Sequence, residues 1–115
     1  ALSEKNDTIR VVNDQLGTPT SAKELAKAIG YLLPTDNFGT FHATCEGSCS
    51  WADFAQKIFQ LAGKKTIVNG ISTAEYNAPA ARPAYSILDN YMLRLTSDYK
   101  FAEWEDAIED YMKTL

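Results

Sequence analysis

The residue best suited to bind an anion in this sequence is Arg82, which lies in a stretch stiffened by Pro79 and Pro83. A guanidinium keeps its charge at physiological pH, and its planar fork of N–H donors fits the oxygens of a diphosphate. Prolines on both sides restrict the backbone and lower the entropic cost of ordering the side chain. The alternative is a salt bridge with one of the 15 acidic residues of the chain. The sequence alone leaves both interpretations open.

A second polar stretch, residues 11–20, reads VVNDQLGTPT and combines turn residues with one amide side chain. The Gln15 amide can donate to a ligand oxygen and accept from a hydroxyl or a base. Gly17 permits close approach of the backbone, and Pro19 keeps the turn tight. The pattern makes Gln15 a second candidate for ligand binding, with Gly17 and Pro19 shaping the turn beside it. The alternative for Gln15 is a turn residue that satisfies local backbone groups.

Residues 11–20 are expected to connect a strand to a helix. Residues 8–12 are β-branched and alternating, which predicts a short strand. Ser21 is suited to cap the following helix with Glu24 completing a capping box, and Pro34 ends it. Loops between a strand and a helix present free backbone N–H groups and often bind ligands in α/β proteins. Apolar residues at helical spacing predict the buried face of this helix: Leu25, Ala26, Ile29, Leu32 and Leu33.

The middle of the chain predicts two further strands with a helix between them. The strands are expected at residues 40–44 and 66–71, both rich in β-branched and apolar residues. The helix is expected to start at Trp51, with a capping box of Ser50 and Asp53, and to end at Gly63. Trp51 lies beside apolar partners, so core packing is the favoured interpretation for its ring.

Two more helices are expected toward the C-terminus. Asp89 is suited to cap a short helix through Tyr91, Leu93 and Leu95, and the last helix starts near Glu103. Apolar spacing predicts the buried face of the last helix: Trp104, Ala107, Ile108, Tyr111 and Leu115. Short strands interspersed with about four helices indicate one α/β domain of an α+β-like kind over residues 1–115.

Composition and charge limit the classes of function. A chain of 115 residues with 45% apolar and 23% charged residues is typical of one globular domain. The net charge of −4 argues against a nucleic-acid partner, which would require a basic face. No apolar run approaches the ~20 residues that span a bilayer. We therefore expect a cytoplasmic protein without a nucleic-acid or membrane partner.

Few other side chains could do chemistry. His42 has no nucleophile or acid at a fixed spacing, so a core or edge-strand histidine is favoured over a catalytic one. Cys45 and Cys49 form a C-x-x-x-C pattern that matches neither a redox motif nor a zinc site. A disulfide between them is conceivable, but two reduced thiols are expected in the cytoplasm. The residues alone indicate no metal site and no catalytic acid–base pair.

Four elements in the correct order resemble the family of dTDP-4-dehydrorhamnose reductases, which are extended short-chain dehydrogenases. Residues 11–20 resemble the family's Val-Val-x-Asp-Gln-x-Gly-x-Pro-Thr segment, and residues 78–89 its Ala-x-Arg-Pro-x-x-Ser-x-Leu-Asp stretch. Residues 39–61 are similar to its block from a Gly-x-aromatic-His start to a Trp-x-x-Phe-Ala helix. The closing helix matches at Trp104, Ala107 and Tyr111. The resemblance extends over residues 8–115.

The resemblance implies that this chain is the C-terminal, substrate-binding part of a reductase. Such an enzyme converts dTDP-4-dehydro-6-deoxy-L-mannose to dTDP-L-rhamnose with NADPH or NADH, as a step in polysaccharide biosynthesis. It further implies that Arg82 neutralises the diphosphate of the dTDP-sugar and that Gln15, Gly17 and Pro19 line the nucleotide-sugar cleft.

The cofactor half of such an enzyme is expected to lie outside this chain. The sequence has no glycine-rich dinucleotide fingerprint and no Tyr-x-x-x-Lys pair. An N-terminal NAD(P)-binding Rossmann domain is therefore expected as a partner, and this chain alone is expected to bind no cofactor, to carry no catalytic residue and to be inactive. A homodimer is a further expectation.

Two other functions stay open. Relatives of the family include non-catalytic members such as the regulatory subunit of methionine adenosyltransferase, so this chain could be a binding or regulatory module. It could also be a freestanding domain that interacts without a nucleotide. Binding of dTDP that depends on Arg82 would favour the reductase, whereas a protein partner with no nucleotide effect would favour a module.

Overall fold

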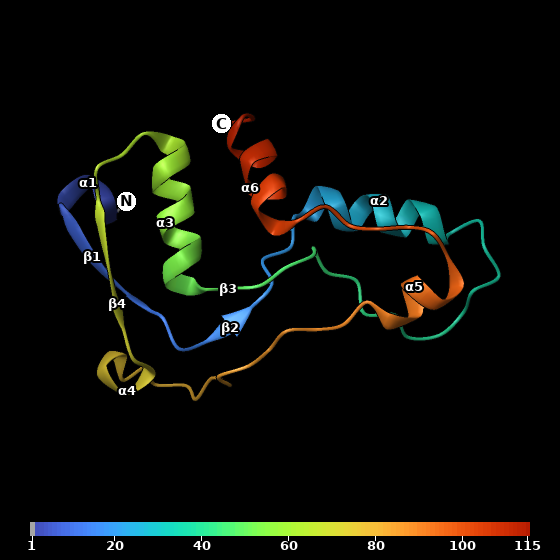
Figure 1. Ribbon diagram of the computed structural model, residues 1–115, viewed down its shortest axis with the longest axis horizontal. Helices are drawn as coiled ribbons and strands as arrows, with labels where there is room; N and C mark the ends of the chain where they lie inside the picture. Colours follow the sequence, from blue (N-terminus) through green and yellow to red (C-terminus); the bar gives the residue numbers. More distant parts are fainter. Residues whose placement is uncertain (1) are drawn as a thin grey trace.

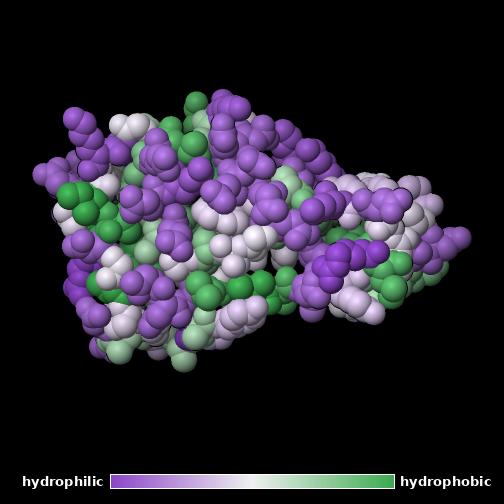
Figure 2. Space-filling model, in the orientation of Figure 1, coloured by the Kyte–Doolittle hydropathy of each residue, from purple (hydrophilic) through white to green (hydrophobic). Residues whose placement is uncertain are grey.

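The computed structural model describes residues 2–115, with side chains from residue 4 onward. The molecule is elongated, measuring 50 × 32 × 19 Å with a radius of gyration of 16.5 Å (Figure 1). A compact chain of this length would have a radius of gyration of about 13 Å. Hydrophilic residues cover much of the face seen in Figure 2, and hydrophobic residues form several separate patches, one of them beside its narrow middle. A thin molecule of this kind covers few side chains completely.

Short strands alternate with helices along the chain, which confirms the α/β prediction. The helices are α1 (Leu2–Lys5), α2 (Ala22–Leu32), α3 (Trp51–Ala62), α4 (Thr73–Tyr76), α5 (Tyr91–Thr96) and α6 (Trp104–Met112). The strands are β1 (Thr8–Val12), β2 (Leu16–Gly17), β3 (Cys49–Ser50) and β4 (Ile67–Ile71). Four of the helices in the described part are longer than one turn, as expected. Within residues 2–115, no helix is long and apolar enough to cross a membrane.

Two small sheets organise these elements. β1 and β4 pair in parallel, in register from Thr8 opposite Ile67 to Val12 opposite Ile71. α3 precedes β4 and packs against both strands (Figure 1). β2 and β3 pair antiparallel, with Leu16 opposite Ser50. Because β3 runs directly into α3, this second pair brings the N-terminus of α3 beside the predicted ligand loop.

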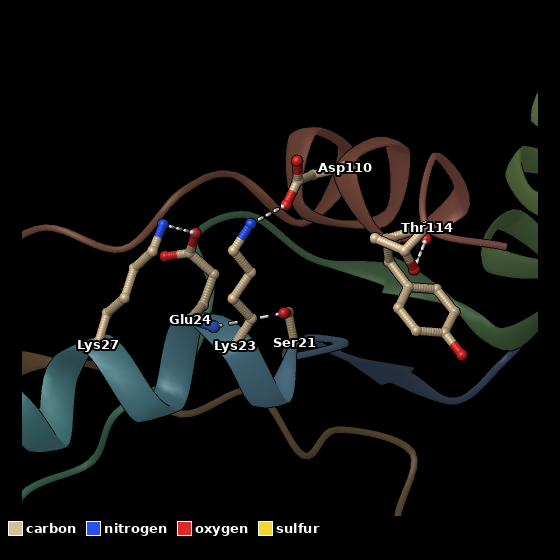
Figure 3. Close-up of polar contacts among 7 residues, drawn as sticks. Ser21, Lys23, Glu24, Lys27, Asp110 and Thr114 are labelled. Carbon is tan, nitrogen blue, oxygen red and sulfur yellow. Dashed lines mark hydrogen bonds and ion pairs between the residues drawn. The ribbon is translucent and has the colours of Figure 1, made fainter.

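The helix ends follow the predicted capping chemistry. Ser50 and Asp53 form a complete capping box at the start of α3, and Gly63 ends that helix with a left-handed φ of 69°. Ser21 accepts a hydrogen bond from the Glu24 backbone N–H, but the reciprocal half of this second box is not made. The Glu24 carboxylate instead pairs with Lys27 at 3.4 Å (Figure 3).

A cluster of buried residues joins α2, α5 and α6. Its members are Ala28, Cys45, Cys49, Leu93, Phe101, Trp104 and Ala107. The Phe54 ring of α3 meets the Trp104 ring edge-to-face at 6.0 Å between centroids. On the surface, the Lys23 ammonium of α2 lies 2.9 Å from the Asp110 carboxylate of α6 (Figure 3). This cluster fixes the helices around the segment that leads into β3.

The prediction of a strand at residues 40–44 is wrong, because this segment is a loop. At Thr44 the backbone pairs with a side chain in place of a neighbouring strand. The Asn90 amide oxygen accepts a hydrogen bond from the Thr44 N–H at 3.0 Å, and its NH2 group donates to the Thr44 carbonyl at 2.7 Å. A buried Asn can thus mimic a strand partner, which apolar patterning does not reveal.

Asp89 does not cap α5, contrary to the prediction. Asn90 occupies the N-cap position without a side-chain cap bond, since its amide is engaged by Thr44. The Asp89 carboxylate instead receives two hydrogen bonds from Arg94, one of them 3.0 Å long. The Arg94 guanidinium thereby holds the pKa of Asp89 below its ordinary range.

The buried faces of two helices also differ from prediction. In α2 the buried residue is Ala28, which is 1% exposed, whereas Leu25, Ile29 and Leu33 are exposed. α2 carries two apolar rows, and the small Ala28 side chain allows the closer approach to the core. In α6 Trp104 and Ala107 are buried as predicted, but Tyr111 is exposed, and so is Leu115 beyond the end of the helix. Trp104, Ala107 and Tyr111 share one face of α6, so burial of that face ends before the last turn of the helix.

Candidate functional site

The two polar stretches singled out in the sequence meet at Leu16. Its N–H donates to the Ala84 carbonyl at 2.8 Å, and its carbonyl accepts from the Ser86 N–H at 2.9 Å. The Ser86 hydroxyl donates to the same carbonyl at 3.1 Å, across 70 residues of sequence. Because Leu16 also pairs with Ser50, three extended segments lie side by side at this point (Figure 1). The site is therefore assembled by backbone hydrogen bonds of β2.

Gln15, Gly17, Pro19 and Arg82 all line one cavity of about 390 Å³. A second, adjoining cavity of about 760 Å³ lies between α3, β1 and residues 76–82. The two cavities share four side chains: Gln15, Trp51, Phe54 and Arg82. Volumes of this size are typical of small-molecule sites. The geometry thus brings the four predicted residues together, and their part in ligand binding stays a prediction.

The Gln15 side chain is held by α4 and not by its own turn. Its Nε2 donates to Thr73 Oγ1 at 3.2 Å, 58 residues away in sequence. The Thr73 hydroxyl and N–H both donate to the Asp14 carboxylate. These hydrogen bonds, that of the hydroxyl first, lower the pKa of Asp14. A chain of hydrogen bonds from Asp14 through Thr73 therefore fixes the Gln15 amide at the cavity.

Arg82 is exposed and has no acidic partner in the described part of the chain. No carboxylate among residues 4–115 lies within 4.0 Å of its guanidinium, so the salt bridge considered as an alternative is not formed there. Arg10, which lines the larger cavity as well, lies 4.0 Å from the Glu75 carboxylate. The cavities thus present a cation whose charge is not neutralised by a neighbouring side chain.

Gly17 allows a neighbouring segment to approach closely, and its own backbone conformation is an ordinary one. It lies in β2 and is not among the described glycines with a positive φ. A Cβ atom at this position would lie 3.1 Å from Ser86 Oγ, which is tighter than ordinary van der Waals contact. The absence of a side chain therefore allows residues 84–86 to pack against β2.

Sequence reasoning missed Trp51 as a site residue. The ring was expected in the core, yet it is 56% exposed and lines both cavities. It occupies the first position of α3, directly after the capping Ser50. The next position, Ala52, is the one that is buried against the core. The capping box was a usable signal, because it fixes where the helix begins and which residue then projects at its start.

The remaining candidate side chains do not contribute to the site as reactive groups. His42 is exposed in the loop of residues 40–44, so the core or edge-strand placement was wrong. Cys45 and Cys49 are free thiols, as expected, and both are buried. Burial raises the pKa of both, that of Cys49 to about 11, which keeps these thiols protonated and unreactive. No group of His, Cys, Asp or Glu in the described residues could hold a metal ion.

The arrangement places a cation, a fixed amide and an aromatic ring on one surface of a small α/β unit. The sequence profile of the RmlD substrate binding domain matches residues 1–115. This chain belongs to that family.

Solved and curated relatives agree with this assignment. A dTDP-4-dehydrorhamnose reductase from Clostridium acetobutylicum is 45% identical with a TM-score of 0.93, over 98% of this chain and 40% of the reductase. The reductase from Bacillus anthracis, solved in complex with NADP, is 41% identical with a TM-score of 0.95, over 99% of this chain and 41% of the reductase. The spore coat polysaccharide biosynthesis protein SpsK of Bacillus subtilis is 34% identical, over 97% of this chain and 39% of SpsK. The chain thus spans about two fifths of the length of these relatives.

Proposed function

We propose that this chain binds the dTDP-linked sugar in an NADPH-dependent dTDP-4-dehydrorhamnose reductase. The enzyme would reduce dTDP-4-dehydro-6-deoxy-L-mannose to dTDP-L-rhamnose, and residues 1–115 would form its substrate-binding domain. The observation that carries the proposal is the unpaired Arg82 guanidinium beside the fixed Gln15 amide on one cavity. A diphosphate is the ligand group that such a cation fits best.

Each of the four residues has a distinct part in this proposal. Arg82 neutralises the diphosphate through charge-assisted hydrogen bonds. Gln15 hydrogen-bonds the nucleotide, and Thr73 keeps its amide in place. Gly17 and Pro19 form the wall of the cleft and bring the segment of Ser86 close.

The reduction itself is assigned to protein outside these 115 residues. These residues do not form a dinucleotide site, since the sequence lacks a glycine-rich fingerprint after a strand and a Tyr-x-x-x-Lys pair. We infer that an N-terminal Rossmann domain holds NADPH and supplies the proton donor, and that the 115 residues alone are inactive. We also place the enzyme in the cytoplasm as a homodimer.

The test of the proposal is Arg82→Ala, measured by titration calorimetry with dTDP. Hydrogen bonds to charged groups are worth about 1.5–3 kcal/mol, so the dissociation constant should rise roughly tenfold to hundredfold. The wild-type affinity should also fall with added salt, because the contact is electrostatic.

Arg94→Ala is the matched control, because it removes the same charge from an exposed arginine that is paired with Asp89 and lines neither site cavity. This variant should bind dTDP like the wild type. Equal loss of dTDP affinity in both variants would show that the loss comes from the change in net charge and not from the position of Arg82. Wild-type protein that binds no dTDP would contradict the proposal outright.

A further inference from the structure

The Trp51 ring is 56% exposed within these 115 residues. Among the described residues its one aromatic contact is with Phe54, edge-to-face at 6.4 Å between centroids and 65° between planes. A single contact of this kind leaves at least one face of the indole without an aromatic neighbour. Large aromatic side chains lose much favourable burial when they stay in solvent. The ring therefore remains available to a ligand.

Trp51 shares both cavities with Arg82 and Gln15, so three complementary groups line one surface. Along α3, Trp51, Phe54 and Ile58 follow helical spacing and form one wall of the larger cavity. The capping box holds Ser50 and Asp53 on either side of Trp51, which fixes where the helix starts. The ring thus projects from a rigid element and needs little ordering to bind.

The Gln15 amide lines the same two cavities and has a carbonyl oxygen that is not used by the hydrogen bond to Thr73. An ionised Asp14 carboxylate only accepts hydrogen bonds, so the Thr73 hydroxyl must donate to it and can only accept from Gln15. This assigns the Gln15 NH2 group to Thr73. Within residues 4–115 no donor reaches the Gln15 carbonyl oxygen. A ring N–H of a nucleobase is a donor of the matching kind.

We propose that Trp51 is the stacking platform for the base of a nucleoside diphosphate, with Gln15 accepting from the base edge and the phosphates directed to Arg82. The inference rests on the proposed function and adds the orientation of the nucleotide and its base-specific contact. An aromatic face, a free acceptor and an unpaired cation are the three groups that such a ligand requires. A docking surface for a protein segment would not require the free cation.

The experiment compares two ligands, dTDP and inorganic pyrophosphate, by titration calorimetry of the same 115-residue chain. Loss of base stacking on an aromatic ring weakens binding roughly tenfold or more. Trp51→Leu should therefore bind dTDP at least tenfold more weakly than the wild type and bind pyrophosphate equally well. Trp51→Phe, which keeps an aromatic face, should retain most of the dTDP affinity. Arg82→Ala should lose affinity for both ligands.

Tyr91→Leu is the matched control, because Tyr91 is the first residue of α5, is 58% exposed and lines neither site cavity. Its affinity for dTDP should equal that of the wild type. In Trp51→Leu the remaining tryptophan, the buried Trp104, reports folding through its fluorescence, which should match that of folded protein and not respond to dTDP.

The outcomes separate the base subsite from the proposed function. Unchanged dTDP affinity in Trp51→Leu, or equal losses for dTDP and pyrophosphate, would overturn the base subsite while dTDP binding by the wild type still stands. Wild-type protein that binds neither ligand would overturn the proposed function, and the base subsite with it.

Discussion

Replacing Leu93 by alanine should remove about half of the folding stability of this chain. Leu93 is the largest side chain that is fully buried among the described residues, at 1% exposure, and it lies in the cluster that joins α2, α5 and α6. Leu-to-Ala changes in such positions cost about 3 kcal/mol, since they remove transfer free energy and leave a cavity. At about 0.05 kcal/mol per residue, a thin chain of 115 residues has roughly 6 kcal/mol in total.

The assay is urea unfolding followed by circular dichroism. With a slope of about 1.5 kcal/mol/M, the midpoint of Leu93→Ala should fall by about 2 M urea at an unchanged slope. Leu95 on the same helix is 63% exposed and provides the matched control, because its replacement by alanine should cost less than about 0.5 kcal/mol. A loss below 1 kcal/mol for Leu93→Ala, or equal losses in both variants, would refute this account of the core.

Two further predictions concern titrating groups. In Cys45→Ala the remaining thiol is Cys49. Because its pKa is about 11, about one molecule in a thousand carries the thiolate at pH 8. Ellman's reagent should therefore react with the folded variant roughly a hundredfold more slowly than with the same variant unfolded in urea. Rapid reaction of the folded protein would contradict this burial. The folded pKa of Asp14 is lowered by Thr73, so its stabilising effect is present above the unfolded pKa of about 3.9 and is lost as pH falls through the folded pKa. Asp14→Asn should therefore lose less unfolding free energy than the wild type on acidification from about pH 5 to pH 2, and parallel losses would exclude this role for Asp14.

The features that could be predicted from the sequence are those set by neighbouring residues. The capping boxes depend on side chains three residues apart, and the start of α3 after Ser50 and its end at Gly63 are as predicted. β1 and β4 follow from their β-branched composition. Local chemistry of this kind is independent of which surface is later covered by the rest of the chain.

The predictions that failed depend on distant partners. α2 has apolar side chains on two rows, and periodicity cannot show that Ala28 faces the core while Leu33 stays in solvent. The loop at residues 40–44 has the composition of a strand, but its partner is the Asn90 side chain, 46 residues from Thr44. The favoured core placement of Trp51 was wrong for a related reason, because helical spacing shows which residues share a face but not whether a ligand or the protein covers it.

The site could be predicted as a set of residues but not as a surface. The chemistry of the Arg82 and Gln15 side chains predicts that each can bind a ligand. That the two lie on one surface depends on the backbone of Leu16, whose side chain has no such chemistry. Leu16 contributes its backbone N–H and carbonyl to Ala84 and Ser86 on one side and pairs with Ser50 on the other. Since Ser50 also caps α3, the same two-residue strand places Trp51 beside both polar stretches. Backbone pairing through β2, together with the missing side chain of Gly17, is thus what turns three separate sequence features into one candidate binding surface.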